Sequence, residues 1–451
     1  MQDYRNLATE LVAAFKKQGV DAVDVFVVTS SNFNTTVRAG QIEKLQQSIS
    51  KGLGMRIFKA GAQALTFTTD FTDKSVKSLV AQALDIVKVS NPDKYNGLAP
   101  KELLGSYDGK LQMFDESLAK VTPERKIEIA KEMEAAGRAL DKRITNTRGS
   151  SWSDTTRQVT LANSDGFAGQ FRTTSANMSL SMLAEENGVK QTDYWFSTAR
   201  YFDKLASPKS VGEEAARRAL RKLGGRKVKS QKVPVVVAPE ISNGLVSMVF
   251  GAASGGSVWR KSSFLIDKVG AEIASPLVHI IDDATMEDGL ASRPFDGEGV
   301  RSSRVALVEG GVLKTYVCDS YSGRRLNVKP TGNTARGYSS GPSVSATNLY
   351  MKAGTTDPKE IIKGVKSGLY LTALPSFGQG FNNVTGDFSE GAQGFWIENG
   401  EVTYPVQEIT LAGNILTLLK SITAVGNDLS FRLGSTAAPT LLISEATVGG
   451  E

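Results

Sequence analysis

The side chains that most often hold a catalytic zinc ion are scarce in this sequence. It contains one histidine, His279, and one cysteine, Cys318, whereas a zinc site needs three or four ligands drawn from His, Cys and carboxylates. His279 has apolar neighbours in the segment SPLVHIIDD, and Cys318 lies in YVCDSY, which we expect to be a strand. A site could add Asp282 or Asp283 to these two, but a core histidine and a buried thiol are the simpler interpretation.

A nucleophile pattern, G-x-S-x-G, occurs at residues 337–341 and centres on Ser339. In hydrolases this pattern needs a strand before the serine, a helix after it, and a histidine and an acid elsewhere. Here Pro342 follows, and then a Ser/Thr-rich stretch and an expected strand from Asn348 to Met351. We interpret the match as chance. The glycines at 251–257 do not form a phosphate loop either, because Ser257 stands where the Walker pattern needs lysine. We therefore predict no catalytic residue in this chain.

Asp296 and Glu298 alternate with glycines in the segment DGEG. Glycines free the backbone, so we expect an exposed turn there. The two acids could contribute to a binding cleft, or they could pair with Arg301 or Arg304 in an ordinary turn.

The segment from Lys329 to Tyr338 is polar and carries Arg336 and Tyr338 near its end. Such a loop could bind an extended peptide through backbone hydrogen bonds and an arginine or aromatic anchor. It could also only connect two strands. Our candidate peptide-binding residues are Arg336, Tyr338, Asp296 and Glu298.

A strand followed by a helix occupies the middle of the chain. Val233–Val237 is a β-branched run typical of a buried strand, and Pro239 ends it. The apolar segment from Ile241 to Ala253 then has the spacing of a helix. Between residues 241 and 256 there is no His, Cys, Asp or Glu, so this central unit has no residues for acid, base or metal chemistry.

This layout resembles the TldD/PmbA family, also called modulators of DNA gyrase, whose zinc-bearing members carry His-Glu-x-x-x-His on the equivalent helix. Aligned on Gly251, these three positions fall on Ser247, Met248 and Ala252, which suit neither zinc binding nor general-base catalysis. The chain therefore resembles the PmbA (TldE) branch, which lacks the zinc motif. Segments that match the family run along nearly the whole chain: DKRITNTRGSS (141–151), AEENG (184–188), GGSVWRKSSFLID (255–267), GLASRPFDGEGVRSSR (289–304), SYSGRRL (320–326), GDFSEGAQGFWIENGEVTYPVQEITLAGN (386–414) and VGND (425–428).

The resemblance implies a non-zinc subunit of a two-chain metalloprotease that degrades or processes small or unfolded peptides. In the family this includes leader removal from peptide antibiotics and antitoxin turnover. It implies no metal in this chain, zinc in a TldD-type paralogue that forms a heterodimer with it, a homodimer in isolation, and extended peptides as substrates. The alternative is a stand-alone peptide-binding or scaffold protein without catalysis.

Composition is that of an ordinary globular protein: 40% of residues are hydrophobic, 22% are charged, and the net charge is +6. A chain of 451 residues is long enough for two or three domains. The basic residues between Arg217 and Lys232 have no interleaved aromatic residues, so we expect a solvated helix end and no nucleic-acid site. A single cysteine, no signal-peptide pattern and no long apolar run predict a cytoplasmic protein without a membrane span.

We predict an α+β fold: an N-terminal α/β region with an antiparallel sheet and flanking helices, and a C-terminal mixed β-sheet or barrel-like domain carrying the central helix. The domain boundary is placed near residue 226, giving 1–226 and 227–451, with a further split near 91–115. The segments expected to be helices are 4–18, 73–89, 122–141, 207–223, 241–253, 357–368 and 412–425. The expected strands are 22–28, 34–37, 42–49, 54–58, 62–68, 233–237, 277–281, 304–308, 312–318, 348–351, 395–397, 402–404 and 440–444, with antiparallel strands across 144–201.

Overall fold

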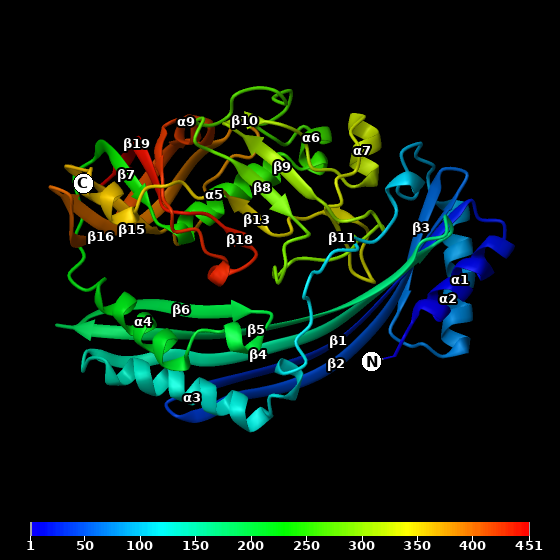
Figure 1. Cartoon of the computed structure of the whole chain (residues 1–451), viewed down its shortest axis with the longest axis horizontal. Helices are drawn as coiled ribbons and strands as arrows, with labels where there is room; N and C mark the ends of the chain where they lie inside the picture. The colour runs from blue at the N-terminus through cyan, green and yellow to red at the C-terminus, as the bar shows by residue number, and fades with distance from the viewer. Residues whose placement is uncertain (1, 451) are drawn as a thin grey trace.

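The structure is a computed structural model that describes residues 2–450, and its architecture is α+β, as predicted. A long, curved antiparallel sheet from the N-terminal half runs beneath the C-terminal half, with α1 and α2 at one end (Figure 1). Its strand order is β3-β2-β1-β4-β5-β6. The elements of this half are α1 (Arg5–Lys17), β1 (Ala22–Arg38), β2 (Gln41–Lys59), β3 (Ala62–Thr68), α2 (Asp73–Val89), two short 3-10 turns (Lys101–Leu103 and Leu118–Lys120), α3 (Pro123–Ala139), β4 (Ile144–Asn163), β5 (Ala168–Glu186), β6 (Val189–Ala199), a 3-10 turn (Phe202–Lys204) and α4 (Pro208–Leu220).

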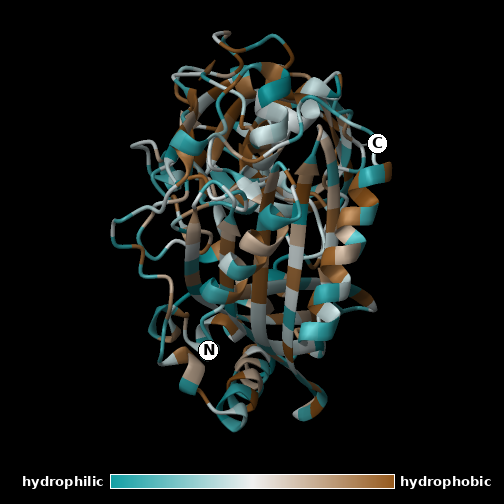
Figure 2. Cartoon of the chain, turned by 90° about the vertical axis from the view of Figure 1, so that its right-hand side faces the viewer, coloured by the Kyte–Doolittle hydropathy of each residue, from teal (hydrophilic) through white to brown (hydrophobic). Residues whose placement is uncertain are grey.

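The two faces of this sheet are covered by different parts of the chain. Along β5 buried residues alternate with partly exposed ones, as expected when successive side chains point to opposite faces. Met178 and Leu180 pack with α3 and α4 on one face, whereas Phe171 faces Phe295 of the C-terminal half on the other. Figure 2 shows the alternating hydropathy along these strands. Odd-numbered residues of β5 such as Phe171 therefore point toward the C-terminal half.

The first two strands are longer than predicted. We expected separate short strands at 34–37, 42–49 and 54–58, but β1 and β2 pair without a break from Val28 opposite Gly52 to Thr36 opposite Lys44. The polar side chains in the middle of β1 and β2 do not interrupt these strands, because backbone hydrogen bonding does not depend on side-chain polarity. The polar side chains pair across the strands instead: the hydroxyls of Ser30 and Ser50 lie 2.8 Å apart.

In the described residues the C-terminal half contains three sheets: a large mixed sheet, a five-stranded sheet in the order β10-β9-β8-β13-β18, and the two-stranded sheet β11-β12. Strands β16-β15-β14-β7-β19 form a mixed sheet, and β19 also pairs with β16, which closes the sheet into a barrel. This confirms the barrel-like prediction. The elements are β7 (Gln231–Val237), α5 (Pro239–Ala252), α6 (Gly255–Trp259), β8 (Ile280–Asp283), β9 (Arg304–Glu309), β10 (Val312–Leu313), α7 (Ser320–Leu326), β11 (Thr334–Ala335), β12 (Ser343–Val344), β13 (Leu349–Met351), α8 (Pro358–Lys363), β14 (Ser367–Ala373), β15 (Asp387–Glu398), β16 (Glu401–Asn414), α9 (Ile415–Lys420), β17 (Ile422–Val425), a 3-10 turn (Phe431–Leu433), β18 (Thr436–Ala437) and β19 (Leu441–Gly449).

Two predicted helices in this half were too long. The segment 357–368 forms α8 only to Lys363, because Gly364 ends the helix and residues from Ser367 join β14. The segment 412–425 begins in β16, and the Asn414 side chain accepts a hydrogen bond from Leu416 N to cap the short α9. Similarly, β10 ends at Leu313, so Cys318 does not lie in a strand. The predicted strand at 277–281 begins only at Ile280, where pairing with β9 starts.

Candidate functional site

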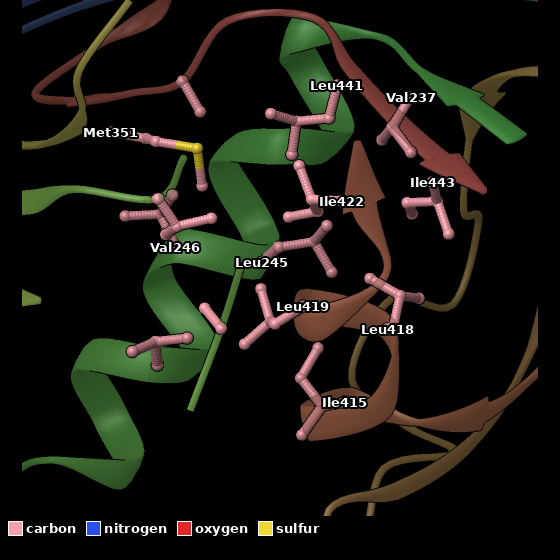
Figure 3. Packing of buried hydrophobic residues seen from close by; sticks show 14 of the residues in the cluster. Val237, Leu245, Val246, Met351, Ile415, Leu418, Leu419, Ile422, Leu441 and Ile443 are labelled. Atoms are coloured by element: carbon pink, nitrogen blue, oxygen red, sulfur yellow. The ribbon is translucent and has the colours of Figure 1, made fainter. Parts of the chain in front are cut away.

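The central helix α5 is a core element that follows β7 directly. Pro239 occupies its first turn, where a missing N–H costs no helical hydrogen bond. Figure 3 shows Leu245 directed toward Leu419 and Ile422, with Val246 on the side of Met351. Burying side chains of this size contributes roughly 1.5–3 kcal/mol each. The helix is therefore fixed by packing on the barrel.

The three positions at which the family resemblance implies two zinc ligands and a general base carry side chains without metal chemistry. Ser247 is exposed, and its hydroxyl donates to the carbonyl of Asn243 at 3.0 Å. Met248 is half-buried and lines a small apolar cavity, and Ala252 is buried. These residues do not fit zinc, whose usual ligands are thiolate, imidazole and carboxylate. Within residues 2–450 no group of three or more His, Cys, Asp or Glu side chains could hold a metal ion.

His279 and Cys318 lie in separate surroundings. The His279 Nδ1 atom accepts a hydrogen bond from Gly310 N at 3.3 Å. Cys318 is fully buried, and burial raises the pKa of its thiol to about 12, so the thiolate is disfavoured at neutral pH. Neither residue has the surroundings of a nucleophile or a ligand.

Ser339 lies in the connection between β11 and β12, a two-stranded hairpin. No helix follows it directly, and its side chain is exposed. The strand–turn–helix context that a nucleophile elbow needs is missing.

The structure brings all four candidate peptide-binding residues to the junction between the two halves. Asp296 and Glu298 are 2% and 3% exposed, and Arg336 is also buried. The expectation of an exposed turn at Asp296–Gly299 was therefore wrong. The acids also do not pair with Arg301 or Arg304: Glu298 binds Arg56 of β2 at 3.1 Å.

A buried ion network links β1 and β2 to the C-terminal loops. Asp24 accepts from Arg56 at 2.6 Å and from Arg336 at 2.8 Å, and the other carboxylate oxygen of Glu298 accepts from Ser320 N at 2.8 Å. Burial alone would raise the pKa of Asp24, but Arg336 and Arg56 outweigh it and hold that pKa below its usual value. Asp24 and Arg56 were missed because their partners in the C-terminal half, Arg336 and Glu298, lie 312 and 242 residues away in the sequence.

Asp296 is held by backbone N–H groups, whereas Glu298 pairs with an arginine. Its carboxylate accepts from the backbone N–H groups of Glu298, Val300 and Thr334 at 2.8–3.1 Å. Burial, followed by the nearby charge of Glu298, raises the pKa of Asp296 to about 6. It therefore titrates close to neutral pH.

Tyr338 lies over two glycines of β2. A Cβ atom on Gly52 would meet the Tyr338 ring at 2.3 Å, and one on Gly54 would meet the Tyr338 carbonyl oxygen at 1.9 Å. The ring also makes an edge contact with Phe67 of β3, with centroids 6.0 Å apart. Glycine inside a strand often marks such a close approach, so the sequence KGLG carried a signal that we did not use. The loop is docked on β2 rather than free.

A cavity of about 280 Å³ adjoins this junction, and Asp296, Gly297, Ala335 and Arg336 contribute to its wall. Arg336 and Asp296 are thus part of a cavity wall; the Nη1 atom of Arg336 pairs with Asp24, whereas its Nε and Nη2 atoms are buried without a hydrogen-bond partner.

Comparison with known proteins places nearly the whole chain in one family. Residues 23–87, 116–223 and 230–450 match, in order, domain 1, the central domain and the C-terminal domain of the PmbA/TldA metallopeptidases. The chain is 35% identical to metalloprotease PmbA of Escherichia coli O157:H7 over 96% of this chain and 93% of that protein. It is 32% identical to a PmbA homolog of Haemophilus influenzae, covering 100% of this chain and 96% of that one. A TldD homolog of the same organism is 27% identical over 96% of this chain and 94% of that protein.

Solved structures agree in fold. A candidate modulator of DNA gyrase from Bacteroides thetaiotaomicron superposes with a TM-score of 0.91 at 30% identity, covering 100% of both chains. TldE from Thermococcus kodakarensis has a TM-score of 0.88 at 22% identity, covering 98% of this chain and 99% of that one. The identity to PmbA over almost the full length and the three consecutive domain matches establish that the chain belongs to the PmbA/TldD metallopeptidase family.

Proposed function

We propose that this chain is the non-zinc subunit of a two-chain metallopeptidase that acts on small or unfolded peptides. The observation that carries the proposal is α5, which keeps its place in the core while Ser247, Met248 and Ala252 occupy the ligand and base positions implied by the family resemblance. Its relatives include proteins named metalloprotease PmbA and TldD. A paralogue that carries the zinc helix would supply the chemistry, and this chain would supply the binding surface.

An exposed strand edge supports a protein partner. Residues 41–52 of β2 pair only with β1 among the described residues, because β3 begins to pair at Leu53. Ile42, Leu45 and Ile49 of this edge are 48%, 55% and 82% exposed. An unpaired edge with apolar side chains is a surface on which another chain can add. We propose this edge as part of the interface with the paralogue, and a lasting interface of this kind buries more than about 2,000 Å² in total.

The test compares this chain, the zinc-bearing paralogue and their mixture by light scattering and a peptidase assay. We expect a heterodimer on mixing, and peptidase activity only in the mixture. Ile49→Lys should weaken association, whereas Val89→Lys should not, since Val89 is equally exposed at 83% but lies at the end of α2. Full activity of the paralogue alone without association would refute the proposal, and would favour a stand-alone peptide-binding protein.

A further inference from the structure

The cavity at the junction combines arginines with aromatic rings. Its volume is about 280 Å³, near the lower end of the roughly 300–1,000 Å³ of drug-sized ligand sites, so it suits a ligand about as large as one or two residues. Odd-numbered residues of β4 and β5 form one wall, and two loops form the other. The residues that line it are Phe26, Arg157, Val159, Phe171, Thr173, Arg200, Leu290, Ala291, Ser292, Arg293, Phe295, Asp296, Gly297, Thr334, Ala335 and Arg336.

The apolar part of the cavity is built from packed rings. Phe295 is 1% exposed and meets Phe171 edge-on at 5.1 Å between ring centroids. Phe26 and Val159 belong to the same hydrophobic cluster. These side chains hold one another in place, so they form a preorganised apolar surface.

Three arginines of the cavity have no carboxylate partner within salt-bridge distance among the described residues: Arg157, Arg200 and Arg293. Arg157 makes no side-chain hydrogen bond in residues 2–450, and Arg293 donates only from Nη2, to the carbonyl of Gly332 at 3.2 Å. The Nε atom of Arg293 is buried without a partner. Arg200 is 3% exposed and donates only to carbonyl oxygens, including Gly289 O at 2.6 Å. Arg56 and Arg336, by contrast, each form an ion pair with Asp24, and Arg56 also pairs with Glu298.

Burying a charge is costly, and the cost is visible at Arg200, which is buried, and at Arg293, which is half-buried, whereas Arg157 is exposed at the mouth of the cavity. Burial lowers the pKa of Arg293, and lowers that of Arg200 to about 10. Asp296 is the only carboxylate that lines the cavity, and its pKa of about 6 leaves part of it neutral below pH 7. An anion in the cavity would offset the excess positive charge.

The chemistry of the walls favours a carboxylate on an apolar body. The arginine fork matches a carboxylate with two parallel hydrogen bonds, and the rings offer contact to an apolar side chain. Phosphate sites commonly use N–H groups at helix N-termini or glycine-rich loops, whereas strands and loops form this wall. We propose that this cavity binds the C-terminal carboxylate of a peptide that ends in an aromatic or other apolar residue, with Arg157 and Arg293 as the carboxylate-binding residues.

This inference rests on the proposed function for its ligand class, but its test needs no partner. Fluorescence anisotropy of the purified full chain would compare a labelled short peptide ending in phenylalanine with its C-terminal amide. The free acid should bind at least about tenfold more tightly than the amide, because only the free acid carries the negative charge that pairs with the arginines. Arg157→Gln should remove most of this preference for the acid over the amide.

The matched control is Arg148→Gln on the same strand, β4. Arg148 is exposed and lies outside the cavity. Because Arg148→Gln changes the net charge by the same amount as Arg157→Gln, it should leave the affinity for both peptides unaffected if only the cavity matters. Equal affinity for acid and amide, or no effect of Arg157→Gln, would overturn the proposal. Displacement of the peptide by inorganic phosphate at lower concentration than by N-acetylphenylalanine would identify a phosphate site and overturn the assignment as well.

The result also separates this inference from the proposed function. A peptidase-active mixture with no carboxylate preference in the chain alone would refute the cavity ligand and leave the function standing. Carboxylate-selective binding by the chain alone, together with a mixture that is inactive and unassociated, would refute the proposed function and leave the cavity ligand standing.

Discussion

Substituting Asn for Asp24 tests whether the buried network holds the two halves of the molecule together. Asp24 is 1% exposed and accepts three side-chain hydrogen bonds from Arg56 and Arg336, at 3.0, 2.6 and 2.8 Å. Asp24→Asn removes the negative charge and leaves both arginines facing Glu298 alone. Breaking a buried ion pair by removing one partner costs about 3–5 kcal/mol, and a retained carbonyl acceptor puts the expected loss near the lower value.

Urea unfolding of the wild type and of Asp24→Asn measures the free energy of unfolding of each protein. Limited proteolysis measures the exposure of the loop that contains Tyr338. Asp108→Asn serves as the control, because Asp108 also pairs across a long sequence separation, with Arg301 at 2.7 Å, but its side chain is 85% exposed. Exposed pairs contribute about 0–1 kcal/mol. We expect Asp24→Asn to lower the free energy of unfolding by at least about 2 kcal/mol more than the control does. Equal losses would show that the network does not stabilise the junction.

Three further predictions follow from single residues. Gly54→Ala should displace the Tyr338 loop and raise its protease sensitivity, because the new Cβ would lie 1.9 Å from a backbone oxygen. The control Gly251→Ala, whose Cβ would meet nothing within 4 Å, should be neutral or stabilising. Equal protease sensitivity of the two variants would contradict the docking of the loop. The pKa of Asp296 in the folded state, about 6, exceeds the unfolded value of 3.8, so the folded state binds more protons. The free energy of unfolding of the wild type should therefore fall by up to about 3 kcal/mol relative to that of Asp296→Asn as pH rises from 4 to 7. Parallel curves of unfolding free energy against pH for the two proteins would refute this. Ser339→Ala should leave the peptidase rate of the mixed chains unchanged, and loss of turnover with assembly intact would restore the nucleophile interpretation.

Elements with local signals could be predicted from the sequence. Thr122 and Ser207 each precede a proline and cap their helices through the side-chain oxygen, as α3 and α4 show. The turns at 164–166 and 186–188 separate β4, β5 and β6 as expected. Caps and tight turns act over a few residues, so the sequence alone carries them.

The junction could not be predicted in the same way. Arg56 and Glu298 are 242 residues apart in the sequence, and nothing local shows that a charged strand residue is buried by another half of the chain. The structure brings Asp296, Glu298 and Arg336 together, but it buries the turn of the two acids that we expected to be exposed; a role of these residues in peptide binding stays a prediction. Glycine-bounded acids are typical of exposed turns, and here tertiary packing buries them. The predicted domain boundary near residue 226 and the split near 91–115 stay predictions, although β1 and β4 from either side of that split pair in one sheet.

The zinc content of the assembled pair tests the central claim most directly. This chain and its zinc-bearing paralogue would be purified separately and mixed, and native mass spectrometry would report the subunits and the metal bound to each. The account predicts one chain of each kind with one zinc ion per pair, bound to the paralogue and lost when its motif histidines are replaced. It also predicts no zinc on this chain alone. A stoichiometric zinc on this chain, retained after dialysis against a weak chelator and lost with His279→Ala or Cys318→Ala, would contradict the account.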